Sequence, residues 1–134
     1  MTQELTIPKG LVDSKPDVAV LLDLADYYAH RALPASGVDS DVAYDCPRTQ
    51  LMVRTAVKGT TIGRHFHSVT DEIVVVTGGR GEILVNGVWI PVTRGSLHVC
   101  PRGIIHDTRA LEENLQYLSN FTRHPPPGTD INWI

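Results

Sequence analysis

The sequence lacks the features that mark disulfide-rich, membrane-spanning, secreted or nucleic-acid-binding proteins. It has only two cysteines, Cys46 and Cys100, far apart, whereas a disulfide scaffold of this size usually has more. No apolar run is long enough to span a bilayer, and the first ten residues do not resemble a secretory signal. The net charge is only −3, and no Lys or Arg run suggests a nucleic-acid surface. We therefore expect a cytoplasmic protein with free thiols, no membrane association and no nucleic-acid partner.

The length of 134 residues favours a single domain with one core. Residues 1–45 are expected to form an N-terminal arm outside that core. Within the arm, apolar residues recur at helical spacing and predict a helix over Ser14–Ala32, with Ser14 as N-cap and Pro16 near the first turn. We expect Leu33–Asp45 to be a connecting loop that leads into an extended stretch.

From residue 49 onward, short runs of β-branched and apolar residues alternate with glycine and proline. Asn86-Gly87 predicts a two-residue hairpin turn of type I′. The segment Leu111–Arg123 is compatible with a helix by itself, but its place after many strands favours β structure. We therefore predict an all-β sandwich or barrel over residues 49–123 and a tail over 124–134. Its other predicted strands are Leu51–Val57, Thr61–His67, Glu72–Thr77, Glu82–Val85, Val88–Val92 and Leu97–Cys100.

Histidines are the unusual feature of the composition, because four of the six lie between positions 65 and 106. On a strand, His65 and His67 would point to the same face, about 6.6 Å apart along it. A four-residue turn then leads to Glu72, which we expect as a cross-strand neighbour of the histidine pair. His106 follows the Pro-x-Gly turn that begins at Pro101 and would add a third imidazole. Three imidazoles and one carboxylate suit a divalent Fe, Mn, Zn, Ni, Co or Cu ion and leave two octahedral positions open.

The two stretches resemble the two signature motifs of the cupin superfamily. The sequence matches every element of the first motif, G-x5-H-x-H-x3,4-E-x6-G. It matches every element of the second, G-x5-P-x-G-x2-H-x3-N, except the last, where Ala110 replaces Asn. Ser96 also replaces the Asp that is common after the first glycine of the second motif. The matching positions are Gly59, His65, His67, Glu72 and Gly79 in the first motif, and Gly95, Pro101, Gly103 and His106 in the second.

The resemblance implies a small single-domain bacterial cupin, an RmlC-like jelly roll or double-stranded β-helix, in which His65, His67, Glu72 and His106 hold one metal. It also implies a homodimer. The run Ile73–Val76, apolar on both faces, agrees with this, since its outer face needs cover from the Ser14–Ala32 segment or a second subunit.

The fold does not select the reaction, because cupins include enzymes and binding proteins. The leading hypothesis is a metal-dependent dioxygenase acting on a small organic acid or polyphenol, with Glu72 also serving as a base. A Lewis-acid isomerase, cyclase or lyase is the second hypothesis, and a binding domain without turnover is the third. The histidines could instead be core residues without a metal. His98 shares a strand face with Cys100, and we expect a structural role for it. Which of Tyr117 and Asn120 faces the pocket stays open.

Overall fold

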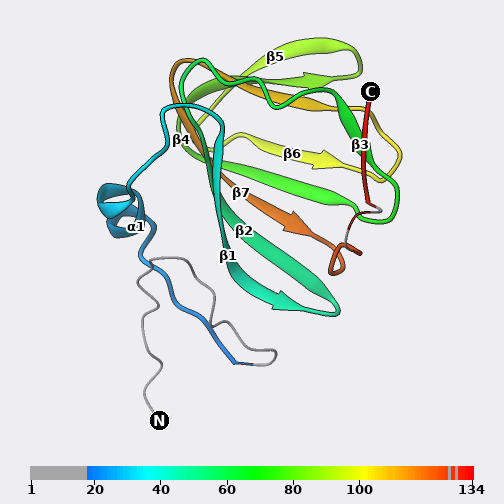
Figure 1. The fold of residues 1–134 in the computed structure, drawn as a ribbon, viewed down its shortest axis with the longest axis horizontal. Helices are drawn as coiled ribbons and strands as arrows, with labels where there is room; N and C mark the ends of the chain where they lie inside the picture. Colours follow the sequence, from blue (N-terminus) through cyan, green and yellow to red (C-terminus); the bar gives the residue numbers. More distant parts are fainter. Residues whose placement is uncertain (1–17, 127, 129) are drawn as a thin grey trace.

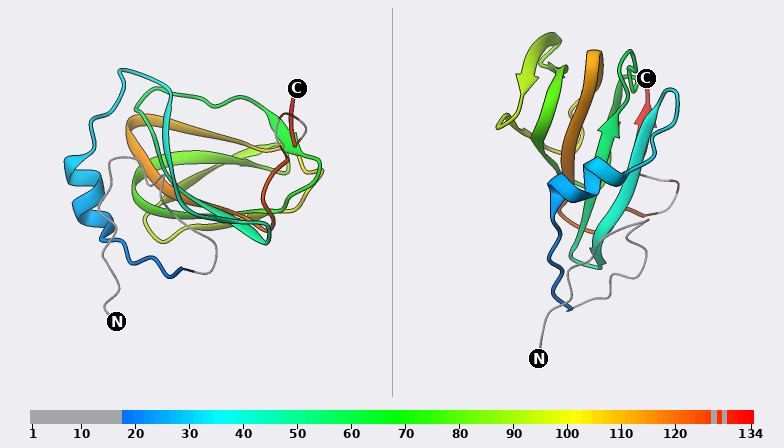
Figure 2. Two further views of the ribbon diagram at one scale, coloured as in Figure 1. Left: turned by 60° about the horizontal axis from the view of Figure 1, so that its bottom comes forward. Right: turned by 90° about the vertical axis from the view of Figure 1, so that its left-hand side faces the viewer.

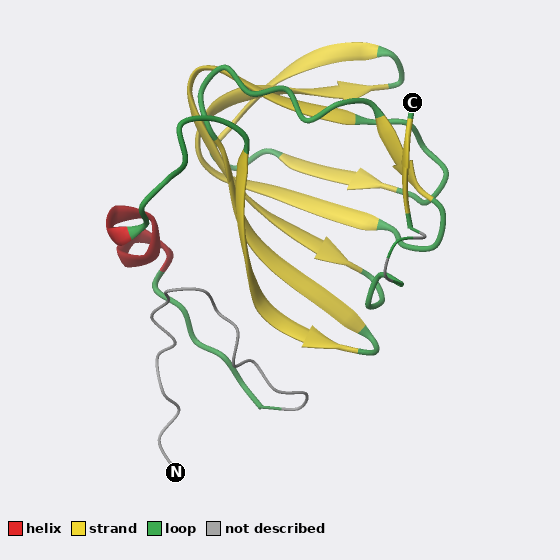
Figure 3. Cartoon of the chain, viewed as in Figure 1, coloured by secondary structure: helices red, strands yellow, loops and turns green. Residues whose placement is uncertain are grey.

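A computed structural model describes residues 18–126, 128 and 130–134, and within them the chain is built mainly of antiparallel strands (Figure 1). One short helix precedes the strands in this part of the chain (Figure 3). In chain order the elements are α1 (Leu24–His30), β1 (Val38–Cys46), β2 (Thr49–Ala56), β3 (His65–His67), β4 (Glu72–Val85), β5 (Val88–Thr93), β6 (Leu97–Cys100), β7 (Asp107–Phe121) and β8 (Ile131–Trp133).

The strands form two sheets around a common interior. The larger sheet has the order β1-β2-β7-β4-β5, with β6 paired to β4, and the smaller sheet pairs β3 with β8. The long strands β4 and β7 pair with each other along most of their length, while β6 follows the first part of β4 and β5 its last part. Seen from the side, the large sheet curves so that β3 and β8 close the interior (Figure 2). The predicted all-β jelly-roll barrel is confirmed.

Strand β4 runs continuously through the glycine-rich stretch that we expected to separate two strands. The register between β4 and β7 shifts between Val76 and Gly78 and again between Gly79 and Gly81. Gly79 has φ 73°, and a Cβ there would overlap the carbonyl oxygen of Asn114. These residues therefore form bulges that bend β4 without ending it.

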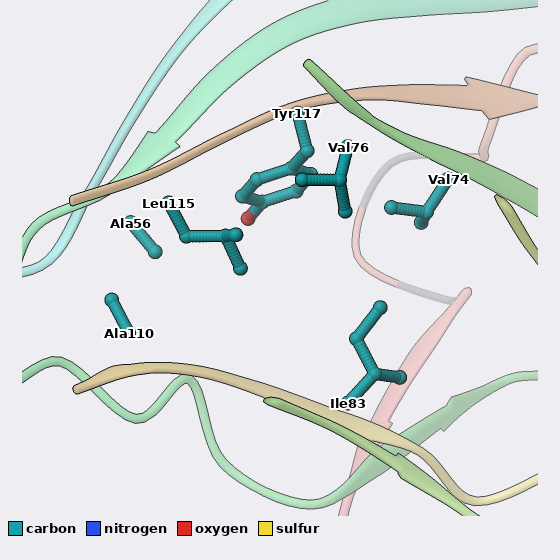
Figure 4. Close-up of a cluster of buried hydrophobic side chains, with 7 residues drawn as sticks. All are labelled: Ala56, Val74, Val76, Ile83, Ala110, Leu115 and Tyr117. Atoms are coloured by element: carbon teal, nitrogen blue, oxygen red, sulfur yellow. The ribbon is translucent and has the colours of Figure 1, made fainter. Parts of the chain in front are cut away.

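Apolar side chains fill the interior near this bend and form a hydrocarbon cluster (Figure 4). The buried side chains come from β2, β4 and β7, which contribute to the interior at alternate positions. Tyr117 belongs to this cluster, and its buried hydroxyl makes no hydrogen bond. The cluster comprises Ala56, Val74, Val76, Ile83, Ala110, Leu115 and Tyr117.

The helix predicted over Ser14–Ala32 is present but shorter, and it covers Leu24–His30. Residues 18–23 are not helical, and residues 14–17, including the expected N-cap Ser14, lie outside the described part. The helix begins at Leu24, because Asp23 supplies the N-cap by accepting a hydrogen bond from the Asp26 amide at 3.0 Å. Its buried residue, Tyr27, packs against the outer face of β1 and β2.

Two strands lie where the sequence predicted none. Val38–Cys46, expected mostly as a loop of the arm, pairs with β2 and extends the sheet before residue 49. Ile131–Trp133, expected as tail, pairs with β3. Conversely, the predicted strand Thr61–His67 is regular only from His65, with a single bridge at Thr61.

The Asn86-Gly87 turn has the predicted positive φ at both residues, 50° and 80°. No helix among the described residues is long and apolar enough to cross a membrane.

Candidate metal centre

Strand β3 carries the histidine pair at the end of the barrel opposite the hydrocarbon cluster. Both His65 and His67 are buried, whereas Phe66 between them is only partly so, as the alternation of a strand requires. The backbone of His65 exchanges two hydrogen bonds with that of His106, which places the third imidazole beside the first. The ring centroids of His65 and His106 are 4.3 Å apart.

Glu72 reaches the histidines across the interior and not from a neighbouring strand. We expected a hairpin between β3 and β4, but Glu72 at the start of β4 pairs with Cys100 and Phe121, while β3 pairs with β8. The turn between β3 and β4 thus crosses from one sheet to the other. The predicted residues nevertheless meet, because the ligand atoms of His65, His67, Glu72 and His106 all lie within 4.8 Å of one another and all four residues are buried.

The Nδ1 atom of each histidine is engaged by an acceptor outside the group. His65 Nδ1 lies 2.7 Å from the Gly63 carbonyl oxygen, and His106 Nδ1 lies 3.0 Å from that of Ile104, in each case two residues earlier. His67 Nδ1 lies 3.0 Å from Asp130 Oδ2. Since these acceptors require Nδ1 to carry a proton, each Nε2 is left to face the centre of the group.

The atoms at the centre fit a cation. His67 Nε2 is buried without a hydrogen bond, although Glu72 Oε1 is only 3.2 Å away. The same oxygen lies 3.1 Å from His106 Nε2. With Nδ1 protonated, His67 Nε2 presents a lone pair toward an anionic oxygen, an arrangement that a positive ion between them would stabilise. Three imidazole nitrogens and one carboxylate are the ligand chemistry of divalent transition metals.

Without an ion, a proton on His106 compensates the negative charge of Glu72. Burial lowers the pKa of His106, but hydrogen bonds to Cys100 and Glu72 outweigh it and raise this pKa to about 10. Burial raises the pKa of Glu72, yet contacts with His106 and His67 and the charge of Arg54 hold it well below the usual range. Burial lowers the pKa of His65. Glu72 is therefore an anion at neutral pH, as a metal ligand must be.

Asp130 supports the group and was missed by the sequence analysis. Its buried carboxylate accepts hydrogen bonds from the Val69 amide at 2.8 Å and from the Thr70 amide and hydroxyl at 3.1 and 2.6 Å, besides its contact with His67. Burial raises its pKa, but these hydrogen bonds outweigh burial and lower it. A carboxylate that holds the distal nitrogen of a ligating histidine fixes the ring orientation. Asp130 is outside both motifs, so only the pairing of β8 with β3 reveals it.

A pocket of about 300 Å³ opens in front of the four residues. Trp133 of β8 forms part of its wall, with its ring centroid 5.0 Å from that of His65. Tyr117 lines this pocket, whereas Asn120 faces a separate groove on the outside of the sheet. The other wall residues are Gln50, Met52, Arg54, Ile62, Thr108, Phe121, Pro125 and Ile131, together with Asp130.

The remaining residues considered from the sequence lie outside the ligand group. The His98 ring centroid is 6.4 Å from that of His106, and its ligand atoms are not part of the cluster. Ser96, at the position of the common Asp, accepts a hydrogen bond from the Thr93 amide at 3.1 Å and so supports its turn. Ala110 is buried in the hydrocarbon cluster, where the polar side chain of the usual Asn would have no place.

Comparisons with known proteins agree with this fold and site. A model of the cupin domain matches residues 52–119, just over half of the sequence. The chain therefore belongs to the cupin family, whose fold and metal-binding motifs it carries. A comparison with curated proteins finds no match.

Many solved structures share the fold. KdgF from Halomonas sp. superposes with a TM-score of 0.64 at 20% identity, over 72% of this chain and 91% of that one. A conserved protein of unknown function from Streptococcus pyogenes gives 0.59 at 27% identity, over 67% and 77% of the two chains. The polyketide cyclase RemF from Streptomyces resistomycificus gives 0.64 at 17% identity, over 72% and 70%.

Proposed function

We propose that the chain is a small metalloenzyme of dioxygenase type that binds one divalent Fe or Mn ion and acts on a small organic substrate. The observation that carries the proposal is the convergence of three Nε2 atoms and the Glu72 carboxylate at the wall of a pocket. A bound metal would supply a redox centre and a Lewis acid. Four protein ligands would fill only part of the coordination shell of such a metal, and the pocket beside them would admit a small molecule to the rest.

The chain itself would position the substrate and limit the access of water. Trp133, Phe121 and Ile131 give the pocket a largely apolar wall beside the histidines. Such a wall strengthens electrostatic interactions at the site, because it keeps the local dielectric constant low. The role of Glu72 as a base stays a prediction, and its lowered pKa favours the ligand role over that of a proton acceptor.

Oxygen consumption by the Fe(II)-loaded protein tests the proposal. The protein is loaded anaerobically, its metal content is measured, and oxygen uptake is followed with a panel of small organic acids and polyphenols. We expect uptake only with a substrate present and, in ¹⁸O₂, both labelled atoms in the product. A protein that holds one iron per chain but consumes no oxygen with any panel member would contradict the dioxygenase assignment.

A metal-dependent isomerase, cyclase or lyase is the second candidate. It is supported by solved structures of similar fold that are described as a polyketide cyclase and a putative sugar phosphate isomerase. In this case the metal would act only as a Lewis acid, and zinc would serve as well as iron. Product formation in the absence of oxygen favours this candidate. Tight ligand binding without any turnover favours the third possibility, a cupin that only binds a small molecule.

We also propose that the protein is a homodimer. The described N-terminal residues cover the outer face of β1, β2 and β7. The neighbouring outer face of β4 and β6 is less covered, with Leu97 and Val99 paired to Val75 and Ile73 and themselves 65% and 57% exposed. An apolar face of this kind favours burial against a second copy. Light scattering that finds a monomer at micromolar concentration would contradict the dimer.

A cytoplasmic location remains part of the proposal. Cys46 and Cys100 are both buried and free, and free thiols are typical of reducing compartments. Cell fractionation tests this location directly.

A further inference from the structure

One cationic side chain faces the pocket beside the candidate metal centre. In β2, Met52 and Arg54 line the pocket, whereas Val53 between them packs on the outer face of the sheet. The Arg54 side chain is only 20% exposed. A charge this far removed from water requires compensation from a partner.

Neutral groups hold the guanidinium in place. Arg54 Nε donates to Ser40 Oγ at 3.0 Å, and Nη1 donates to Ser119 Oγ at 3.4 Å. The guanidinium carbon lies 5.3 Å from the centroid of the Tyr117 ring, in a cation–π arrangement. These contacts orient Arg54 but leave its charge unneutralised.

A bound metal would share the negative charge of Glu72, the carboxylate that faces Arg54. Within the described residues, the ion pair of Arg54 is with Glu72 Oε2 at 3.9 Å, which is beyond hydrogen-bond distance. The other carboxylate on the pocket wall, Asp130, is engaged by His67 and Thr70. With a divalent ion, the charges of the metal (+2), Arg54 (+1), Glu72 (−1) and Asp130 (−1) sum to +1 when the histidines are neutral. The loaded pocket therefore favours an anion.

We infer that Arg54 is the carboxylate-binding residue of this pocket, and that the substrate is a small carboxylic acid with a second oxygen that reaches the metal. The inference rests on the proposed metal site. A planar guanidinium forms strong, directional hydrogen bonds with a carboxylate, which makes arginine suited to this role. Since Arg54 lies within 4 Å of a candidate metal ligand, a molecule of a few carbon atoms can contact both. Neutral polyphenols lack the group that Arg54 would bind.

Matched pairs of acids and amides test the inference without any turnover. Binding of L-lactate, L-lactamide, malonate and malonamide to the Co(II)-loaded protein is followed by calorimetry and by the visible spectrum of the metal. We expect Arg54→Gln to weaken binding of the acids by about tenfold or more and that of the amides by less than about twofold. Arg54→Lys, which keeps the charge, should restore part of the affinity for the acids. Arg80→Gln removes an exposed arginine outside the pocket and should change nothing.

Metal affinity, measured on the same variants, separates this role from a structural one. If Arg54 only held Glu72 in place, Arg54→Gln would lower the metal affinity and weaken acids and amides in parallel, which would overturn the inference. It would also be overturned by a metal-loaded wild-type protein that binds no acid more tightly than its amide, and the proposed metalloenzyme function would still stand. A chain that holds no metal would overturn both.

Discussion

The two ends of the barrel interior differ in the side chains that they bury: one end is apolar, and the other is ionisable. Near the bend of β4, side chains such as Leu115, Ile83 and Val76 are almost fully buried against one another, and the interior is complete without a ligand. At the end closed by β3 and β8, the buried side chains include five ionisable groups, namely the four candidate ligands and Asp130. The Nε2 atom of His67 there has no hydrogen-bond partner. The first end is stabilised by the burial of apolar side chains alone, whereas binding of an ion would add to the stability of the second.

This difference has a consequence for mutations. A change at the hydrocarbon end should lower the stability of every form of the protein equally. A change at the histidine end should mainly reduce the difference in stability between the metal-loaded and the metal-free protein. Measuring the stability of both forms therefore distinguishes the two ends.

The largest expected effect is at the hydrocarbon end. Leu115 is fully buried, so Leu115→Ala should lower the free energy of unfolding by about 3 kcal/mol through lost burial and the remaining cavity. Urea denaturation with and without metal measures this effect, and we expect the same loss in both forms. The folded variant should bind the same amount of metal as the wild type. A variant that folds but no longer binds metal would show that the two ends are coupled.

His65→Ala tests the histidine end of the interior. It removes one imidazole of the cluster, so the metal-dependent stabilisation should disappear. For an ion at a hundred times its dissociation constant, that stabilisation is about 2.7 kcal/mol. Elemental analysis and thermal unfolding with and without metal measure the loss, with His98→Ala as the matched control outside the cluster. Unchanged metal content in His65→Ala would remove His65 from the ligand set.

Asp130→Asn should have an intermediate effect, because it weakens a support and not a ligand. The variant loses the anionic acceptor of His67 Nδ1, and we expect the metal affinity to fall by about 10- to 100-fold. A competition titration with a chelator measures the affinity. Asp45→Asn, which disturbs the remote contact with His124, is the control. If the affinity is unchanged while the metal-free protein is destabilised, then Asp130 serves only to anchor β8.

The sequence was sufficient to predict that these four residues meet, because the turns constrain the spacing between them. His65 and His67 share a face on any strand, and the Pro101–Gly103 turn delivers His106 wherever the second sheet lies. The same reasoning failed on pairing partners. It treated Glu72 as the hairpin partner of the histidines, since short-range patterns do not show that a turn crosses between sheets.

What the sequence could not reveal depends on contacts between distant segments. Asp130 and Trp133 reach the site only because β8 pairs with β3, more than sixty residues away. The helix was predicted too long for a related reason. Apolar residues before Leu24 recur at helical spacing, but residues 18–23 are not helical. Leu22 packs against the sheet there, so a tertiary contact overrides the local preference.

Metal binding should release a proton at the histidine end of the interior and none at the hydrocarbon end. In the metal-free protein the pKa of His106 is raised to about 10, so its imidazolium is populated at neutral pH and must lose a proton before Nε2 can bind a cation. Metal affinity should therefore rise about tenfold per pH unit between pH 7 and 9 and level off above about 10. The metal-free form should show the reverse trend, because a raised folded-state pKa gives stability that is complete below the unfolded value and is lost as the pH rises through the folded value. Calorimetry in buffers of different ionisation enthalpy counts the released proton, and Leu115→Ala should leave the count unchanged. An affinity that does not vary over this range would show that His106 is already neutral in the metal-free protein, and that its contact with Glu72 is not an ion pair.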